Sequence, residues 1–200
     1  MPRIIASNRD LHRVEQAIRE APQPYRLMFT ILRETGMRAS EVCTLQVRDV
    51  VLEPGREQLW VRGGKTGDRV VTLTTNTHGR TLRGLRAYLK QIGDRPLAAA
   101  LFLSNRQTQV SYDALEYQWQ QALTQAALTD AHGKARYTLH QLRHTRATEL
   151  LEAGLRLEDV QRVLGHKSIK STQVYAAISD TVLRERLMDV RLPKRQRSDG

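Results

Sequence analysis

The chain contains a single cysteine, Cys43, and no long apolar run. One thiol cannot form an intrachain disulfide, so nothing in the sequence indicates an oxidising compartment, and we expect Cys43 to pack as a small apolar residue. The N-terminal residues lack the apolar core of a signal peptide, and no stretch approaches the roughly 18 apolar residues of a membrane span. We therefore expect a cytoplasmic protein.

Acidic residues are also scarce. Asp and Glu number 21 against 32 Lys and Arg, which gives a net charge of +11 and an isoelectric point near 10.4. Charge of this sign favours a polyanionic partner through phosphate neutralisation and counterion release, and nucleic acid is the simplest such partner. Charge alone does not separate a DNA enzyme from a ribosomal protein or a repressor. The length of 200 residues fits one domain with a proper core.

Apolar periodicity and helix-capping residues predict a mostly helical chain. The sequence SNRD at 7–10 is typical of a capping box, and Gly36 and Gly165 each follow an apolar stripe, as expected at a helix end. Short apolar segments joined by glycine-containing turns predict a three-stranded antiparallel sheet, so the fold class is α+β. The predicted helices span 7–21, 25–34, 40–45, 81–91, 112–128, 138–154, 157–164 and 180–190, and the predicted strands span 47–52, 59–61 and 70–73.

Two arginines and a tyrosine lie in patterns that suit phosphodiester chemistry. Arg38 lies in the segment TGMRASE at 35–41, and Arg143 lies in HQLRH at 140–144. The negative charge of a phosphodiester deepens in a pentacoordinate transition state, so cleavage without a metal needs fixed cationic donors around the non-bridging oxygens. Arginine offers a planar fork of donors that is always charged. Tyr175 is the candidate nucleophile, because a tyrosine hydroxyl can attack phosphorus and form a covalent intermediate.

Three further residues are candidates for proton transfer and oxygen binding at such a phosphate. Lys65, in GGKTGD at 63–68 between two predicted strands, would protonate the leaving 5′-oxygen once neighbouring cations lower its pKa. His140 lies on the same helix face as Arg143, three residues before it. His166 follows the predicted helix end at Gly165 and precedes Tyr175 by nine residues. The two histidines would act as proton handler and oxygen donor.

These segments resemble the tyrosine recombinase (phage integrase) family. The segment HQLRHTRAT at 140–148 is similar to the family's His-x-x-Arg motif, LGH at 164–166 to its Leu-Gly-His turn, and 35–45 to its first-arginine segment. The motifs also occur in the family's order, and the resemblance runs from about residue 7 to about residue 189. It implies the mostly helical catalytic-domain fold of the family with its small sheet, and an active site made of Arg38, Lys65, His140, Arg143, His166 and Tyr175.

The resemblance also implies a domain organisation. Residues 1–190 correspond to the family's catalytic domain, and residues 191–200, which contain four basic residues, are expected to form a flexible basic tail. The family usually carries a separate N-terminal domain that clamps DNA. Because the catalytic motifs begin within the first forty residues here, that core-binding domain is expected to be absent, as in the fimbrial DNA inversion recombinases.

The implied function is site-specific recombination of double-stranded DNA through a 3′-phosphotyrosine intermediate. No nucleotide cofactor or obligatory metal is implied, because the bond energy stays in the phosphotyrosine link. The resemblance implies four protomers on two DNA sites, a free subunit that can be monomeric, a nucleoid-associated location in the cytoplasm, and accessory DNA-binding proteins as further partners. Integration, excision, inversion and resolution remain open as outcomes.

Several alternatives compete with parts of this interpretation. A type IB topoisomerase-like enzyme would use much the same residues on one duplex, and a non-catalytic accessory protein would keep the fold and bind DNA. The lysine turn at 63–68 is not a P-loop, because position 59 is leucine and a strand is predicted to follow. His140 and His144 have helical zinc-site spacing, but Gln141 replaces the glutamate that a metalloprotease needs. Glu41 could pair with Arg38 as a structural contact or hold it for phosphate.

Overall fold

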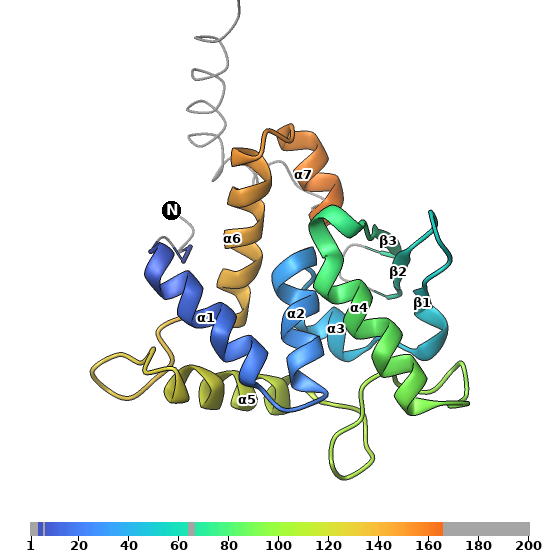
Figure 1. Cartoon of the computed structure of the whole chain (residues 1–200), viewed down its shortest axis with the longest axis horizontal. Coiled ribbons are helices and arrows are strands. Elements are labelled where there is room, and N and C mark those ends of the chain that lie inside the picture. Colours follow the sequence, from blue (N-terminus) through green and yellow to red (C-terminus); the bar gives the residue numbers. More distant parts are fainter. Residues whose placement is uncertain (1–3, 6, 64–66, 166–200) are drawn as a thin grey trace, which may run out of the picture.

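The computed structural model describes residues 4, 5, 7–63 and 67–165 (Figure 1). Within these ranges no helix is both long enough and apolar enough to cross a bilayer. The elements in chain order are α1 (Asn8–Glu20), α2 (Tyr25–Thr35), α3 (Ala39–Cys43), the short 3-10 helix η1 (Val47–Asp49), β1 (Val50–Val51), β2 (Gln58–Val61), β3 (Arg69–Thr72), α4 (Thr75–Ile92), α5 (Tyr112–Gln125), α6 (Leu139–Glu152) and α7 (Leu157–Leu164).

Helix α2 lies at the centre of the domain. It packs against α1, α3, α4 and α6, and the only residue of its sequence that is not buried is Arg26. Its apolar residues pack into the core, and its buried Arg33 and Glu34 are paired with charges from neighbouring helices, so the helix can be covered on nearly every side. It ends where predicted, with Gly36 in the left-handed conformation at φ 67°. The chain after this helix end carries Arg38, so the core places one candidate residue directly.

The sheet is an antiparallel meander in the order β1, β2, β3, as the sequence predicts. Leu59 and Val71 face each other on the buried side, whereas the next pair, Trp60 and Val70, is exposed. This alternation is typical of an antiparallel sheet that is covered on one face. Arg69 opens β3 with the same parity as Val71, so its side chain lies on the covered side and is only 12% exposed.

The predicted strand over 47–52 is wrong in its first half. Residues Val47–Asp49 form η1, and only Val50–Val51 pair with β2. The cause is the Asp49 carboxylate, which accepts the N–H of Gln46 at 2.9 Å and the Nε–H of Arg62 at 2.6 Å. A side chain that closes a turn on its own backbone competes with extension of the strand.

Two predicted helix boundaries also differ from the structure. Helix α4 begins at Thr75 rather than 81, with a kink at His78, whose Nδ1 accepts the N–H of Thr74 at 3.1 Å. Because residues 74–78 are polar, apolar periodicity does not predict this first turn. Helix α5 ends at Gln125 rather than 128, because Ala127 adopts a left-handed φ of 51°.

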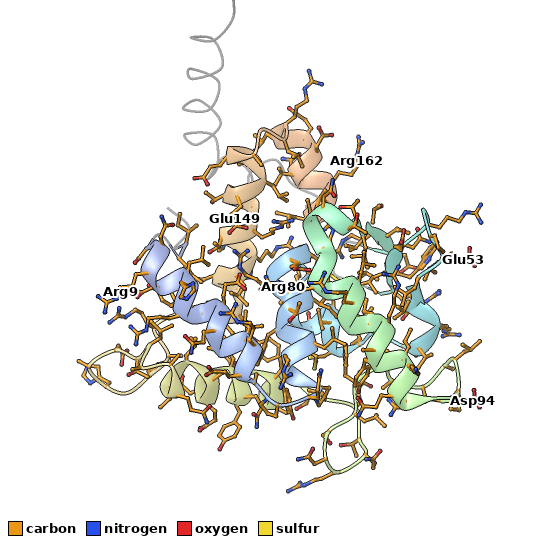
Figure 2. All side chains as sticks on the ribbon, in the orientation of Figure 1. Arg9, Glu53, Arg80, Asp94, Glu149 and Arg162 are labelled. Atoms are coloured by element: carbon orange, nitrogen blue, oxygen red, sulfur yellow. The ribbon has the colours of Figure 1, made fainter. Side chains whose placement is uncertain are left out.

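Partly buried ion pairs join four helices. Arg33 of α2 binds Glu15 of α1 at 2.8 Å and both carboxylate oxygens of Glu149 on α6. Arg80 of α4 binds the same Glu15 and, at 2.8 Å, Glu34 of α2. Figure 2 shows Arg80 and Glu149 near the middle of the molecule, between these helices. Because a buried charge without its partner is costly, these pairs favour one mutual placement of α1, α2, α4 and α6.

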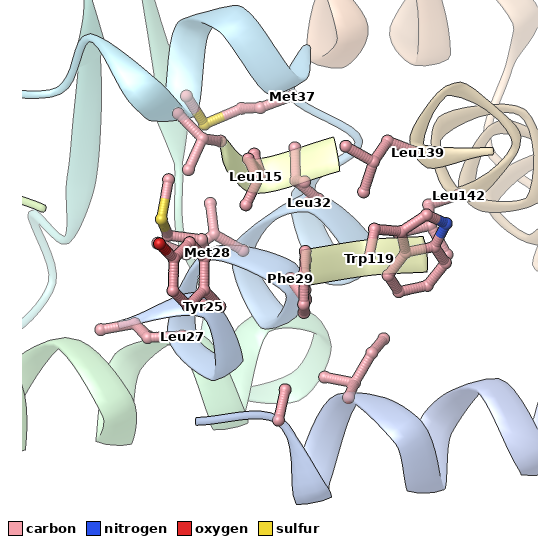
Figure 3. Close-up of a cluster of buried hydrophobic side chains, with 14 of the residues drawn as sticks. Tyr25, Leu27, Met28, Phe29, Leu32, Met37, Leu115, Trp119, Leu139 and Leu142 are labelled. Carbon is pink, nitrogen blue, oxygen red and sulfur yellow. The ribbon is translucent and has the colours of Figure 1, made fainter. Parts of the chain in front are cut away.

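An aromatic pair anchors α5 to the centre of the core (Figure 3). The rings of Phe29 on α2 and Trp119 on α5 meet edge to face with centroids 5.0 Å apart. The indole Nε1–H of Trp119 donates to the carbonyl of Tyr137 at 2.7 Å, just before α6 begins. Leu139 and Leu142 at the start of α6 are buried beside this pair. The core therefore fixes the part of α6 that carries His140 and Arg143.

Replacing Trp119 with alanine should lower the free energy of unfolding by about 3–5 kcal/mol, because it removes a fully buried aromatic ring and leaves a cavity. Tyr117, on the same helix but 61% exposed, provides the matched control. Tyr117→Ala should change stability by less than about 0.5 kcal/mol. Urea unfolding followed by circular dichroism measures both values. Equal losses in the two variants would contradict this description of the core.

Candidate active site

Arg143 ties together two helix ends that are far apart in sequence. Its Nη1 donates to the carbonyl of Gly36 at 2.6 Å and its Nη2 donates to the carbonyl of Leu164 at 2.8 Å. The residue lies on α6 and is only 2% exposed. The last carbonyls of a helix have no partner within the helix, so a buried guanidinium is well suited to bind them. Arg143 thereby brings the segment of the first arginine next to the Leu-Gly-His segment.

The two glycines at these helix ends are favoured over other residues by their backbone conformation and by the small space around them. Both Gly36 and Gly165 have left-handed φ angles, 67° and 69°. A Cβ added at Gly36 would lie 2.5 Å from Cδ2 of Leu164, so the ends of α2 and α7 touch directly. This close approach leaves Arg143 within reach of both carbonyls.

Arg38 is held by a carboxylate three residues later. It is the N-cap of α3, where its N–H donates to Oε2 of Glu41 at 2.8 Å and its Nη1 donates to Oε1 at 2.9 Å. Glu41 is 5% exposed, whereas the Arg38 side chain is 24% exposed. The carboxylate therefore fixes a cation that still reaches the surface. This contact is the one that the sequence raised for Glu41.

A third arginine, which was not predicted from the sequence, completes this cluster. Arg69 of β3 binds Glu41 with both terminal nitrogens, Nη1 to Oε1 at 2.6 Å and Nη2 to Oε2 at 2.8 Å. The signal was present in the strand pattern, because Arg69 shares its parity with the buried Val71. A charged residue at an inward strand position is rare unless it is paired.

The Glu41 carboxyl titrates below its ordinary range. Burial raises its pKa, but the hydrogen bonds from Arg69 and from the Arg38 backbone, together with the charge of Arg69, lower it further than burial raises it. A carboxyl whose pKa falls on folding stabilises the protein above its unfolded pKa, and this stabilisation is lost as the pH drops through the folded value. Glu41 is thus expected to stabilise the fold at neutral pH and not in strong acid.

Glu41→Gln should therefore cost about 1.5–3 kcal/mol of unfolding free energy at pH 7, because it removes the charge from hydrogen bonds to two guanidinium groups. The difference from the wild type should begin to shrink as the pH falls below about 4, where the unfolded carboxyl takes up a proton, and it should vanish only below the lowered pKa of the folded carboxyl. Glu53→Gln, at a site where the side chain is 71% exposed, is the control and should change little. A difference that is constant between pH 7 and pH 3 would contradict the charged role of Glu41.

His140 and His144 lie one turn apart on α6 with their rings edge to face, 4.5 Å between centroids. Partial burial and then the charges of Arg143 and Arg38 lower the pKa of His140. Burial, His140 and Arg143 lower the pKa of His144 to about 4. Both imidazoles are therefore neutral at pH 7, and His140 lies within the electrostatic reach of both candidate arginines. Among the described residues, no group of three His, Cys, Asp or Glu side chains could hold a metal ion.

The structure thus brings together three of the six candidates, namely Arg38, His140 and Arg143. Lys65, His166 and Tyr175 lie outside the described residues, as do the predicted helix over 180–190 and the tail at 191–200. Their neighbours in the chain are described: β2 and β3 flank 64–66, and Gly165 caps α7 immediately before His166. Figure 1 shows the end of α7 beside the start of α4 and close to β3.

Comparison with known proteins assigns the family. The phage integrase family matches residues 7–181, which is most of the chain. The chain belongs to the phage integrase family. This membership confirms the resemblance predicted from the motifs at 35–45, 140–148 and 164–166, and the match includes all six candidate positions.

Relatives within the phage integrase family are similar to this chain in both sequence and fold. The chain is 32% identical over 170 residues to tyrosine recombinase XerC of Pelobacter propionicus, which covers 82% of this chain and 50% of that protein. A crystal structure of XerA recombinase superposes with a TM-score of 0.73 at 27% identity and covers 96% of this chain and 67% of that one. A crystal structure of XerH recombinase bound to palindromic difH substrate, a post-cleavage complex, has a TM-score of 0.71 at 25% identity and covers 93% of this chain and 52% of that one.

Two conclusions follow from these integrase-family comparisons. The predicted fold class is confirmed: a mostly helical domain with a small three-stranded antiparallel sheet, as in the XerA structure. The chain also spans about half the length of the XerC and XerH proteins that it matches.

Proposed function

We propose that this chain is the catalytic unit of a tyrosine-type site-specific DNA recombinase, made of residues 1–190 with a basic segment at 191–200. The observation that carries the proposal is the anchoring of Arg143 on the carbonyls of Gly36 and Leu164. One buried cation joins the first-arginine segment to the Leu-Gly-His segment, and the family's chemistry requires both beside one phosphate. The positive charge of Arg143 then lies between the two segments at which the phosphate would bind.

In the proposed reaction the hydroxyl oxygen of Tyr175 attacks the scissile phosphorus and the bond to the 5′-oxygen breaks. The products are a 3′-phosphotyrosine and a strand with a free 5′-hydroxyl, and attack by the 5′-hydroxyl of a partner strand reverses the step. Neutral His140 takes the proton from Tyr175, and Lys65 gives one to the leaving oxygen. Because the phosphoester is exchanged rather than hydrolysed, the step needs no energy-supplying cofactor.

Arg38 and Arg143 stabilise the charge that develops on the non-bridging oxygens, with His166 as a further donor. The support for Arg38 is its fixed yet partly exposed position on Glu41. The support for His140 as a proton acceptor is its lowered pKa, which keeps the ring neutral at pH 7. Arg38 thus offers a fixed positive charge to the negative phosphate, and His140 offers a neutral ring that can accept the tyrosine proton.

The proposed partner is double-stranded DNA in the cytoplasm, at the nucleoid, and the +11 charge supports it. The stoichiometry follows from the chemistry: exchanging both strands between two duplexes needs four cuts, and each protomer offers one nucleophile. Four protomers on two DNA sites are therefore proposed, and the XerH structure on difH is a relative bound to its DNA substrate. Accessory DNA-binding proteins would supply further contacts.

The test uses a duplex that is nicked next to the crossover, drawn from the sequence flanking the gene. The short fragment beside the nick diffuses away after cleavage, so rejoining stops and the covalent complex accumulates as an SDS-resistant band. The proposal predicts this band on the flanking sequence and not on a scrambled duplex of equal length. With a second duplex that offers a 5′-hydroxyl, it predicts a strand joined across the two.

The same assay identifies the rival functions. A band on any sequence, with relaxation of a supercoiled plasmid but no joining to a partner, would indicate a topoisomerase-like enzyme on one duplex. DNA binding without a covalent band, even when a core-binding domain of the family is added, would indicate a non-catalytic accessory protein.

A further inference from the structure

Arg69 contacts two segments of the candidate site at once. Its two terminal nitrogens occupy both oxygens of Glu41, and Glu41 in turn holds the backbone and the guanidinium of Arg38. Through one carboxylate, the position of Arg38 therefore depends on a residue of the sheet. A bidentate guanidinium fixes the plane of the carboxylate as well as its place, which a single donor does not.

The stem of Arg69 also packs directly on Gly165. A Cβ built on Gly165 would collide with Nε and lie 2.5 Å from Cδ of Arg69, so only glycine leaves room for this side chain. Arg143 binds the carbonyl of Leu164, the residue before. Two arginines from different elements thus hold consecutive residues at the end of α7, immediately before His166 in the chain.

We propose that Arg69 is a positioning residue for DNA strand cleavage, holding Arg38 through Glu41 and holding the end of α7 through its packing on Gly165. This inference rests on the proposed recombinase function. Arg69 lies at the start of β3, and its contacts link the first-arginine segment to the end of α7. Its role is to fix where cations stand around the phosphate, and effects of this kind appear in the rate of cleavage more than in DNA affinity.

The first experiment compares Arg69→Lys with the wild type on the nicked duplex. Lysine keeps the charge but loses the planar fork, so it cannot hold both Glu41 oxygens. The single-turnover cleavage rate at saturating DNA should fall about 10- to 100-fold, whereas the Kd for DNA should change by less than about threefold. Arg33→Lys is the matched control, because Arg33 is also nearly buried and also holds both oxygens of a carboxylate, Glu149, which is not a candidate residue.

The second experiment tests the packing on Gly165 by a double-mutant cycle of Gly165→Ala and Arg69→Ala. The cleavage rate of Gly165→Ala should fall at least 100-fold. The double variant should cleave at least 10-fold faster than expected if the two single losses multiplied, because without the Arg69 side chain the alanine at 165 has nothing to collide with. Gly133→Ala reports the backbone strain alone, since Gly133 has φ 73° with open space around it. Urea unfolding of the same variants should show coupling of the same sign.

The outcomes separate the two proposals. If the wild type forms no covalent complex on any flanking sequence, the proposed function fails, and the positioning role fails with it. If the wild type cleaves and Arg69→Lys cleaves at the same rate, the recombinase function stands and the positioning role of Arg69 is overturned. A loss of cleavage that only follows the loss of folded protein, or additive effects at 69 and 165, would also overturn it.

Discussion

Tyr175→Phe should abolish the covalent protein–DNA complex while leaving DNA binding unchanged. The substitution keeps the ring and removes only the hydroxyl oxygen, which is the atom that the proposed mechanism joins to phosphorus. Without that nucleophile no phosphotyrosine can form, so the loss should be complete within detection, at least about 1,000-fold. Binding should persist because affinity comes mainly from contacts between basic side chains and phosphates.

Tyr137→Phe is the informative control for this loss. The Tyr137 hydroxyl donates to Asp10 at 2.6 Å, so it has a structural role away from the candidate residues. Its removal should cost about 1 kcal/mol of stability and leave the covalent complex intact. A complex that persists in Tyr175→Phe would show that another tyrosine or another residue is the nucleophile, and peptide mapping of the DNA-linked fragment would identify it.

Arg143→Lys should have the second largest effect. Lysine keeps the positive charge but has no planar fork, so one ammonium cannot bind the carbonyls of Gly36 and Leu164 and a phosphate oxygen in the geometry of a guanidinium. The variant therefore loses the anchoring and the fixed direction of its donors. We expect a fall of about 100- to 1,000-fold in the single-turnover cleavage rate, the magnitude typical of removing one fixed oxyanion donor. Stability should fall as well, by about 1–3 kcal/mol, because buried carbonyls lose a donor.

A second buried arginine separates the chemical effect from the structural one. Arg33 is also buried and also binds with both terminal nitrogens, but its partners, Glu149 and Glu15, are not candidate residues. Arg33→Lys should lose a similar amount of stability while the cleavage rate per folded molecule stays within about threefold of the wild type. If both variants lose cleavage in proportion to folded protein, Arg143 has no role in the chemistry beyond folding.

Local sequence predicted most of the helices well. The boundaries of α7 agree with the predicted 157–164, and Gly36 ends α2 as expected, because apolar periodicity and a glycine cap are properties of a few neighbouring residues. The errors had separate local causes, and the end of α5 was one of them, because Ala127 adopts a left-handed φ. Asp49 replaced half of a predicted strand with a turn, and the polar start of α4 at Thr75 carried no apolar pattern.

The residues of the candidate site were likewise predicted only in part. Arg38, His140 and Arg143 were predicted as motif residues, and the match to the family spans the segments that contain them. Their assignment as catalytic, with that of Lys65, His166 and Tyr175, stays a prediction for the cleavage experiments. Arg69 was missed because its partner Glu41 lies 28 residues away, and no local pattern pairs the two.

The sequence by itself determined the family, the order of its motifs, the helical character of the chain and its basic charge. These properties depend on residue types and on spacings within single segments. Only the tertiary structure decided that Arg143 binds Gly36, 107 residues away, and that Arg69 packs on Gly165. Such contacts arise when α2, α6, α7 and β3 are brought together by a shared core, and the free energy of that core is spread over many side chains distant in sequence.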